Sequence, residues 1–238
     1  MSSSKAMKRT SPGKKPCRPQ GQSSETSGFQ GVGGKRNKAT TGRNGGAVMI
    51  PVLFARKDSI YKTLPYCDVY DIDRDALTWP GGTPCVAHPP CRAWGGLSHM
   101  AKPRDGEKEL AIWAVKKIRE SGGVLEHPKR SSLWGYLDLP RPGKKPDEFG
   151  GHSILVNQHW WGHRAEKATL LYIVGCRPKN IPLLPLTITE PTGCVDRKRR
   201  GDGSWYGNGK KIISKKEREA TPLAFAEWLC EIARRCAS

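Results

Sequence analysis

Six short apolar runs, separated by turn-forming and charged sequence, constrain the fold of this chain more than any other feature. An almost continuous apolar run of about four to eight residues is typical of a strand buried on both faces of a sheet. Between the third and fourth runs, residues 105–121 carry an apolar stripe at helical spacing and end at Gly122 and Gly123. Strands that alternate with helices predict an α/β fold with a parallel sheet. The runs occupy residues 48–55, 67–72, 84–87, 124–126, 153–157 and 169–174.

Charge and composition divide the chain into parts. Residues 1–46 contain ten Lys or Arg and a single acid, Glu25. Such a segment cannot bury enough apolar surface to offset its chain entropy, so we predict a disordered basic arm there. After it we expect a catalytic core over 47–175, a small basic insert over 176–213 and a returning C-terminal helix within 214–238. We place the N-cap of that helix at Thr221 and its first residue at Pro222.

The formal net charge of +19 favours polyanionic partners, because counterion release gives affinity for nucleic acid. An acidic lipid surface is the alternative partner. The sequence contains no signal-peptide core and no run of about 18 apolar residues that could span a membrane, so we expect a soluble, cytoplasmic monomer. The eight cysteines form no Cys-x-x-Cys pair, and we expect neither disulfides nor a metal. Zinc bound by Cys85, His88 and Cys91 is the minor alternative.

Candidate reactive residues follow three of the expected strands, in segments 71–76, 88–94 and 126–128. In parallel sheets the chemistry gathers beyond the carboxyl ends of the strands. Two prolines before Cys91 make a rigid turn that presents the thiol outward, and the charge of Arg92 is expected to favour the thiolate. A buried structural cysteine after a proline turn is the alternative.

Glu126, at the end of the next strand, gives this cysteine a chemical partner. By itself it would be taken for a solvated loop acid. Attack of a thiolate on carbon 6 of a pyrimidine is easier if an acid holds or protonates the ring at nitrogen 3. The resulting adduct makes carbon 5 nucleophilic. The pair therefore predicts covalent chemistry on a pyrimidine base.

The order of these motifs resembles the DNA cytosine-5 methyltransferase family. The resemblance implies a Rossmann-like class I methyltransferase sheet, S-adenosylmethionine as cofactor and double-stranded DNA as substrate. The compact chain is similar in style to phage-encoded members, which would act in the bacterial cytoplasm. The segments that carry the resemblance are Asp71-Ile-Asp73-Arg74-Asp75-Ala76, Pro90-Cys91, Leu125-Glu126-His127-Pro128, residues 161–167 running into 171–175, and Glu217-Arg218-Glu219-Ala220-Thr221-Pro222.

The resemblance also implies roles for individual residues. Catalytic roles fall to Cys91, Glu126 and Arg164. Cofactor contacts fall to Phe54, Ala55, Asp71, Asp73, His88 and Pro89, with Asp71 on the ribose. DNA contacts are expected from Arg92, Lys167, Arg197, Lys198, Arg199 and Arg200. Trp160 and Trp161 could stack on a displaced base or pack in the core.

The sequence departs from the family at its first cofactor loop. Residues 54–59 contain none of the glycines that let the backbone approach the cofactor. The stretch between Ala55 and Asp68 is too short for a typical helix of about 11 residues with its loops. His88-Pro89-Pro90 also resembles the Asp/Asn-Pro-Pro loop of amino-methyltransferases that act on adenine or cytosine nitrogen. Three alternatives stay open: such an enzyme, an altered or inactive relative that binds DNA or modifies pyrimidines without S-adenosylmethionine, and a non-enzymatic nucleic-acid-binding protein.

Overall fold

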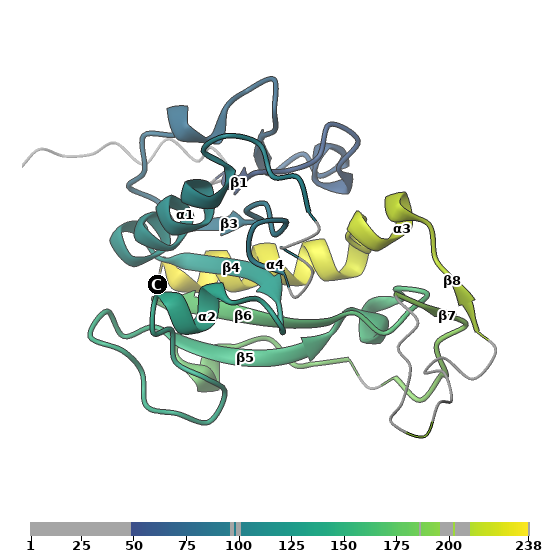
Figure 1. Cartoon of the computed structure of the whole chain (residues 1–238). Coiled ribbons are helices and arrows are strands. Elements are labelled where there is room, and N and C mark those ends of the chain that lie inside the picture. The colour runs from purple at the N-terminus through teal and green to yellow at the C-terminus, as the bar shows by residue number, and fades with distance from the viewer. Residues whose placement is uncertain are drawn as a thin grey trace, which may run out of the picture. The chain divides into compact units, whose positions relative to one another are not determined.

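A six-stranded sheet forms the centre of the computed structural model (Figure 1), with the strand order β2-β1-β3-β4-β6-β5. The structure describes residues 49–95, 98, 101–185, 187–195, 202 and 210–237. The basic arm predicted over 1–46 and the basic run from Arg197 to Arg200 lie outside these residues. No helix in the described ranges combines the length and the apolar composition needed to cross a membrane.

All six apolar runs form strands of this sheet. β1, β2, β3 and β4 pair in parallel, as predicted. β6 runs antiparallel to both of its neighbours, so the prediction of a parallel sheet holds for four strands only. The cause is the connection from β5 to β6, which is a short turn around the 3-10 helix η3 and not a crossover helix. The strands are β1 Ile50–Leu53, β2 Cys67–Tyr70, β3 Cys85–Ala87, β4 Gly123–Pro128, β5 His152–Asn157 and β6 Ala168–Val174.

Helices cover both faces of the sheet. Alternate strand residues point to opposite faces, and because these strands are mostly apolar, each face must be buried. On one face Leu53, Ala87 and Leu125 pack with helix α1, Glu107–Ser121, and with the short helix α2, Leu133–Tyr136. On the other face the core includes buried residues of helix α4, Leu223–Cys236 (Figure 1). The chain therefore has a mixed α/β architecture with few long helices.

The connections between the first three strands, and the predicted insert, contain only short elements. Only 3-10 turns connect β1 to β2 and β2 to β3, which confirms that the stretch after Ala55 has no room for a full helix. A two-stranded sheet of β7 and β8 lies within the predicted basic insert. The remaining elements are η1 Ile60–Thr63, η2 Ala76–Thr78, η3 Gln158–Trp161, η4 Pro178–Asn180, β7 Gly193–Cys194, β8 Lys211–Ile212 and α3 Lys215–Glu219.

The two glycines after α1 serve different purposes. Gly122 is the C-cap of α1, and its N–H donates to the carbonyl of Ile118. Gly123 begins β4 with a φ of 120°, and a Cβ there would lie 2.1 Å from the carbonyl oxygen of Cys85. Only glycine allows this approach, so Gly123 sets the close pairing of β3 and β4 on which the candidate site depends.

The predicted start of the last helix is wrong by one residue. Pro222 is the N-cap of α4, with a non-helical ψ of 144°, and the helix begins at Leu223. The separate helix α3 precedes it and opens with a capping box between Ser214 and Glu217. Two helices therefore occupy the region where one was expected.

Replacing Phe225 by alanine is expected to lower the free energy of unfolding by about 3–5 kcal/mol. Phe225 is fully buried in α4, and its ring centroid lies 4.8 Å from that of Trp161 and 6.1 Å from that of Trp228. Urea unfolding measures the change. The matched control is Leu223→Ala in the same helix, where the side chain is 46% exposed and the loss is expected to stay within about 0.5 kcal/mol. Equal losses would contradict this packing.

Candidate functional site

The carboxyl ends of β3 and β4 bring His88 and Glu126 together. The two strands pair in parallel with Ala87 opposite Leu125, so the next residues on each strand are neighbours. His88 Nδ1 lies 3.1 Å from Glu126 Oε2, and both side chains are 13% exposed. Glu126 lies within β4 and not at its end, since the strand continues to Pro128. His88, which was predicted to contact the cofactor, here contacts the carboxylate expected to bind the base.

Two further side chains complete the hydrogen bonds of this pair. The hydroxyl of Tyr61, from η1, lies 2.9 Å from His88 Nε2. The amide nitrogen of Gln158, from η3, donates to Glu126 Oε1 at 3.2 Å and to Thr169 Oγ1 at 3.1 Å. The carboxylate therefore accepts hydrogen bonds from segments on both sides of β4.

These neighbours keep Glu126 ionised. Burial by itself would raise the pKa of Glu126, but the hydrogen bond with His88 and the charge of Lys167 outweigh it and lower the pKa to about 2. At neutral pH the side chain is a carboxylate, which accepts hydrogen bonds and cannot donate one. At this position it can therefore only accept hydrogen bonds from a ligand.

Cys91 is exposed, three residues beyond His88 in the same loop. Burial of the sulfur raises the pKa of the Cys91 thiol, and the charge of Glu126 raises it further, against an opposing effect of Lys167. The attraction between Arg92 and an ionised Cys91 has the predicted sense, but the pKa of Cys91 is nevertheless raised, because desolvation and Glu126 act in the other direction. The guanidinium of Arg92 also donates to the carboxylate of Glu107, at 2.8 Å for Nε.

Lys167 and Arg164 both contact the segment around α3 in the structure. The charge of Lys167, predicted to contact DNA, acts on both Cys91 and Glu126, and its Nζ donates to the carbonyl of Ala220 at 3.3 Å. The side chain of Arg164, predicted as a third catalytic group, pairs with Glu217 of α3 at 3.2 Å. Lys167 is therefore the cation whose charge reaches both reactive groups.

The two tryptophans of η3 belong to the core on this side of the sheet. Trp161 is 8% exposed and packs against Phe225 and Trp228 of α4. Trp160 is partly buried beside it, with ring centroids 6.0 Å apart. Of the two readings of these rings, the structure favours core packing.

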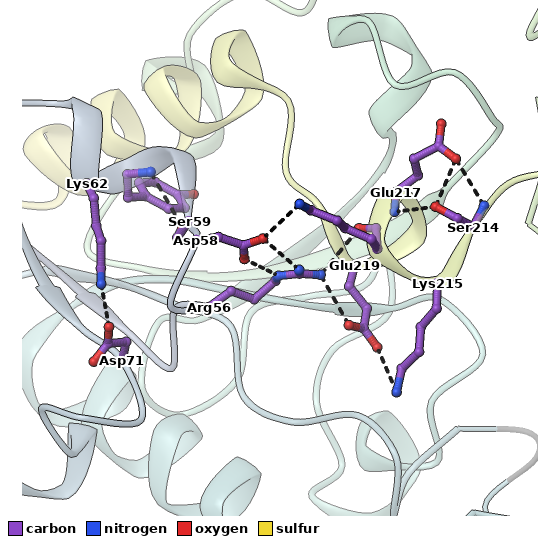
Figure 2. A network of polar contacts seen from close by, with 11 residues as sticks. Arg56, Asp58, Ser59, Lys62, Asp71, Ser214, Lys215, Glu217 and Glu219 are labelled. Atoms are coloured by element: carbon purple, nitrogen blue, oxygen red, sulfur yellow. Dashed lines mark hydrogen bonds and ion pairs between the residues drawn. The ribbon is translucent and has the colours of Figure 1, made fainter.

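The segment after β1, which was predicted to form the first cofactor loop, carries side-chain ion pairs at positions where the resembled family has glycines (Figure 2). Phe54 has a φ of 61° at the end of β1, and its ring packs edge-on against Trp113. Arg56 pairs with Asp58 at 2.8 Å and with Glu219 of α3 at 3.2 Å. Phe54 thus holds a left-handed backbone conformation at a cost typical of strained backbone, while the positions where the family has glycines carry Arg56 and Asp58.

The predicted ribose-binding acids are also occupied. Asp71 Oδ2 accepts from Lys62 Nζ at 2.5 Å, and Oδ1 accepts from the backbone N–H groups of Asp73 and Arg74 (Figure 2 shows the pair with Lys62). The hydrogen bond from Lys62 is the largest cause that lowers the pKa of Asp71 to about 2. Asp73 pairs with Lys57 at 2.7 Å. Both oxygens of Asp71, the acid predicted to hold the ribose, are already hydrogen-bonded, whereas Asp73 is paired through Oδ1 alone, so these residues fit S-adenosylmethionine bound in the family's manner poorly.

Two further residues were predicted to contact S-adenosylmethionine, Ala55 and Pro89. The backbone N–H of Ala55 donates to the carbonyl of Tyr70 at 3.0 Å and extends the pairing of β1 with β2. Pro89 follows His88 in the loop that leads to Cys91. Within the described ranges, no group of three or more His, Cys, Asp or Glu side chains is arranged to hold a metal ion.

Sequence reasoning missed Tyr61 and Gln158. Both reach the site from segments distant in sequence, η1 and η3, and neither lies in a recognisable motif. The contribution of Gln158 depends on η3 folding back over the end of β4, which follows from the reversed direction of β6, and that of Tyr61 depends on where the turn η1 places its ring. The residues themselves carry no signal from which this could have been predicted.

Replacing His127 by leucine is expected to remove part of the acid sensitivity of the fold. His127 is fully buried, and burial lowers its pKa to about 4. An unfolded chain protonates histidine near pH 6.5, so protonation favours unfolding. This contribution to stability is complete above pH 6.5 and is lost as the pH falls towards 4.

Urea unfolding at pH 7 and pH 4.5 measures this effect. The free energy of unfolding should fall by about 2–3 kcal/mol more in the unmodified protein than in His127→Leu. The acid effect of Asp71 is common to both proteins and cancels in the comparison, and that of Glu126 cancels apart from the small part that His127 contributes to its pKa. Equal falls in the two proteins would show that His127 is not held neutral in the folded state.

A nucleophile, a buried carboxylate and a cation therefore share one edge of the sheet. Cys91 supplies a thiol, Glu126 an oriented acceptor, and Lys167 a charge that acts on both. His88 and Gln158 fix the carboxylate through hydrogen bonds. This arrangement suits addition of a sulfur nucleophile to a ring that Glu126 holds through a donor. Comparisons of this chain with protein-family models, with curated proteins and with solved structures found no match.

Proposed function

We propose that this chain modifies cytosine in double-stranded DNA through a covalent bond between Cys91 Sγ and carbon 6 of the base. The observation that carries the proposal is that the loop which ends β3 and carries Cys91 is joined to the Glu126 carboxylate of β4 by the hydrogen bond from His88, at 3.1 Å. A base inside a duplex is out of reach of such a site, so the enzyme must turn the base out of the stack. The formal charge of +19 supports a DNA partner.

The architecture and the motif order support the same conclusion. Four parallel strands have helices on both faces, and the reversed strand β6 lies between β4 and β5. This arrangement resembles the class I methyltransferase sheet. Cys91 follows β3, and Glu126 lies near the end of β4, in the order in which the cytosine-5 methyltransferase family carries its two reactive groups. The sheet thus provides a structural setting for the chemistry that the two residues suggest.

The chemistry of the chain's own residues is activation of carbon 5. The Cys91 thiol loses its proton to solvent, and the thiolate forms a bond to carbon 6. The electron pair of the carbon 5–carbon 6 double bond then takes a proton from water at carbon 5. Loss of the original carbon 5 proton restores the double bond and expels the thiolate. The net result is exchange of the hydrogen at carbon 5 with solvent, which needs no cofactor.

Exchange in deuterium oxide tests the proposal. Duplex DNA is incubated with the full chain, and deuterium at cytosine carbon 5 is measured by mass spectrometry after digestion to nucleosides. We expect deuterium in cytosine above the level of a sample without protein. A duplex that the protein binds but in which cytosine carbon 5 gains no deuterium would contradict the proposal.

The melting temperature is expected not to rise when S-adenosylmethionine or its demethylated product is added at millimolar concentration. A ligand that binds the folded state must stabilise it, by about 2.7 kcal/mol at a hundredfold excess over its dissociation constant. The Lys62–Asp71 and Lys57–Asp73 pairs occupy the carboxylates that this cofactor would use. A clear rise in melting temperature would show that the loop rearranges and would make methyl transfer from S-adenosylmethionine the reaction to test next.

A further inference from the structure

The hydrogen bonds around Glu126 all run towards the carboxylate. An ionised carboxylate only accepts, so His88 donates from Nδ1, and its Nε2 is then left to accept from the hydroxyl of Tyr61. Gln158 uses its amide N–H groups on Glu126 and on the hydroxyl oxygen of Thr169. That hydroxyl donates in turn to the carbonyl of Lys167. These directions fix the orientation of the Gln158 amide, because turning it over would place its carbonyl against the carboxylate.

The second polar atom of the Gln158 amide is its carbonyl oxygen. Gln158 is 1% exposed, and its Oε1 has no hydrogen-bond partner among the residues that the structure describes. A buried acceptor without a donor costs about 1–3 kcal/mol, and native structures rarely retain one without a reason. The oxygen belongs to the same amide that contacts Glu126, so it lies beside the group proposed to bind the base.

The atoms of Glu126 and Gln158 that can still take a hydrogen bond are therefore all acceptors. Each oxygen of Glu126 accepts one bond in the structure and has room for a second, and Gln158 Oε1 has room for its first. A ligand that completes the site must bring donors. Cytosine carries an amino group with two N–H bonds at carbon 4, whereas uracil and thymine carry a carbonyl oxygen there.

We infer that Gln158 is a specificity-determining residue, whose free carbonyl accepts a hydrogen bond from the amino group at carbon 4 of the base while Glu126 accepts the other. This inference rests on the proposed function, since it concerns the base that Cys91 attacks. A uracil at the same place would set its carbonyl oxygen against Gln158 Oε1 and leave that acceptor without a donor, although its ring N–H at position 3 could still donate to Glu126. Sites that are built to bind a donor discriminate strongly against an analogue that lacks it.

The test compares cytosine with uracil in otherwise identical duplexes. Exchange at carbon 5 is followed in deuterium oxide and corrected for the uncatalysed rate. The unmodified protein should exchange cytosine at least about a hundredfold faster than uracil. The variant Gln158→Met keeps the length of the side chain and removes its amide, both the carbonyl and the N–H groups that donate to Glu126 and Thr169. Loss of those donors should lower both rates, and loss of the carbonyl should lower the rate on cytosine about tenfold further, so that the ratio of the two rates falls about tenfold.

A second variant separates selection of the base from support of the fold. Thr169→Val removes the other partner of the Gln158 amide and leaves the carbonyl in place. It should lower both rates by one factor and keep the ratio. If Gln158→Met also keeps the ratio, Gln158 is structural and the inference is wrong. Equal rates on cytosine and uracil in the unmodified protein would overturn the inference and leave the proposed function standing, and exchange of neither base would overturn both.

Discussion

Replacing Cys91 by serine is expected to lower the rate of carbon 5 exchange at least about a thousandfold, because a hydroxyl is a far weaker nucleophile than a thiolate. The substitution changes one atom on an exposed residue, so the melting temperature should stay unchanged. The control is Cys194→Ser on β7, another free cysteine, which should retain full exchange. If Cys91→Ser retains the exchange rate of the unmodified protein, Cys91 is not the nucleophile.

The pH dependence of the same reaction follows from the surroundings of the thiol. Burial and the charge of Glu126 hold the pKa of Cys91 above its ordinary value of 9.0. The thiolate is the reactive form, and its fraction grows as the pH approaches that pKa from below. The exchange rate should therefore rise throughout the range from pH 6 to pH 9. A rate that reaches a plateau below pH 7 would show that DNA binding stabilises the thiolate.

Replacing Glu126 by glutamine is expected to lower exchange on cytosine by about 10²–10⁴-fold. The side chain keeps its size but loses its charge and gains an N–H₂ group. That group must face either His88 or Gln158, both of which donate to the carboxylate in the structure. The variant therefore loses an acceptor for the base and places two donors against each other.

The control for Glu126→Gln is Glu231→Gln on α4, where the carboxylate pairs with Arg235 within one exposed helix face. It should leave exchange unchanged. A melting curve for Glu126→Gln separates loss of chemistry from loss of the fold, since breaking a buried hydrogen-bonded pair costs about 1–3 kcal/mol. If Glu126→Gln folds and exchanges cytosine at the full rate, the carboxylate does not bind the base.

The strands and α1 could be predicted from the sequence because their signals are local. The run at Ile50–Leu53 is apolar throughout, and the stripe of α1 ends at Gly122. The direction of β6 could not be predicted, since it depends on how the chain turns through η3 after β5. An apolar run has the same composition whichever way it points, so only the connection decides.

The candidate site, like the fold, could be predicted from the sequence only in part. Cys91 and Glu126 were predicted to approach each other because their segments follow neighbouring strands, and the contact that the structure shows between these segments is the one from His88 to Glu126. The contacts of Asp71 with Lys62 were not predicted, because a motif gives residue types and not the partners that occupy them. The role of Gln158 depends on atoms from three segments that are distant in sequence. The sequence allowed a prediction that two residues at neighbouring strand ends lie near each other. Hydrogen-bond networks that join distant segments could be found only in the structure.

The most direct test of the central claim is to trap the covalent bond and locate it. Duplex DNA that carries 5-azacytosine keeps the amino group at carbon 4, and after the thiolate adds to carbon 6 the ring nitrogen at position 5 takes a proton from water. The resulting adduct forms without a methyl donor and is long-lived. We predict a protein–DNA complex that survives denaturation, with the nucleotide attached to Cys91 after digestion and peptide mapping. Attachment at any other residue, or no complex with DNA that the protein binds, would contradict the account.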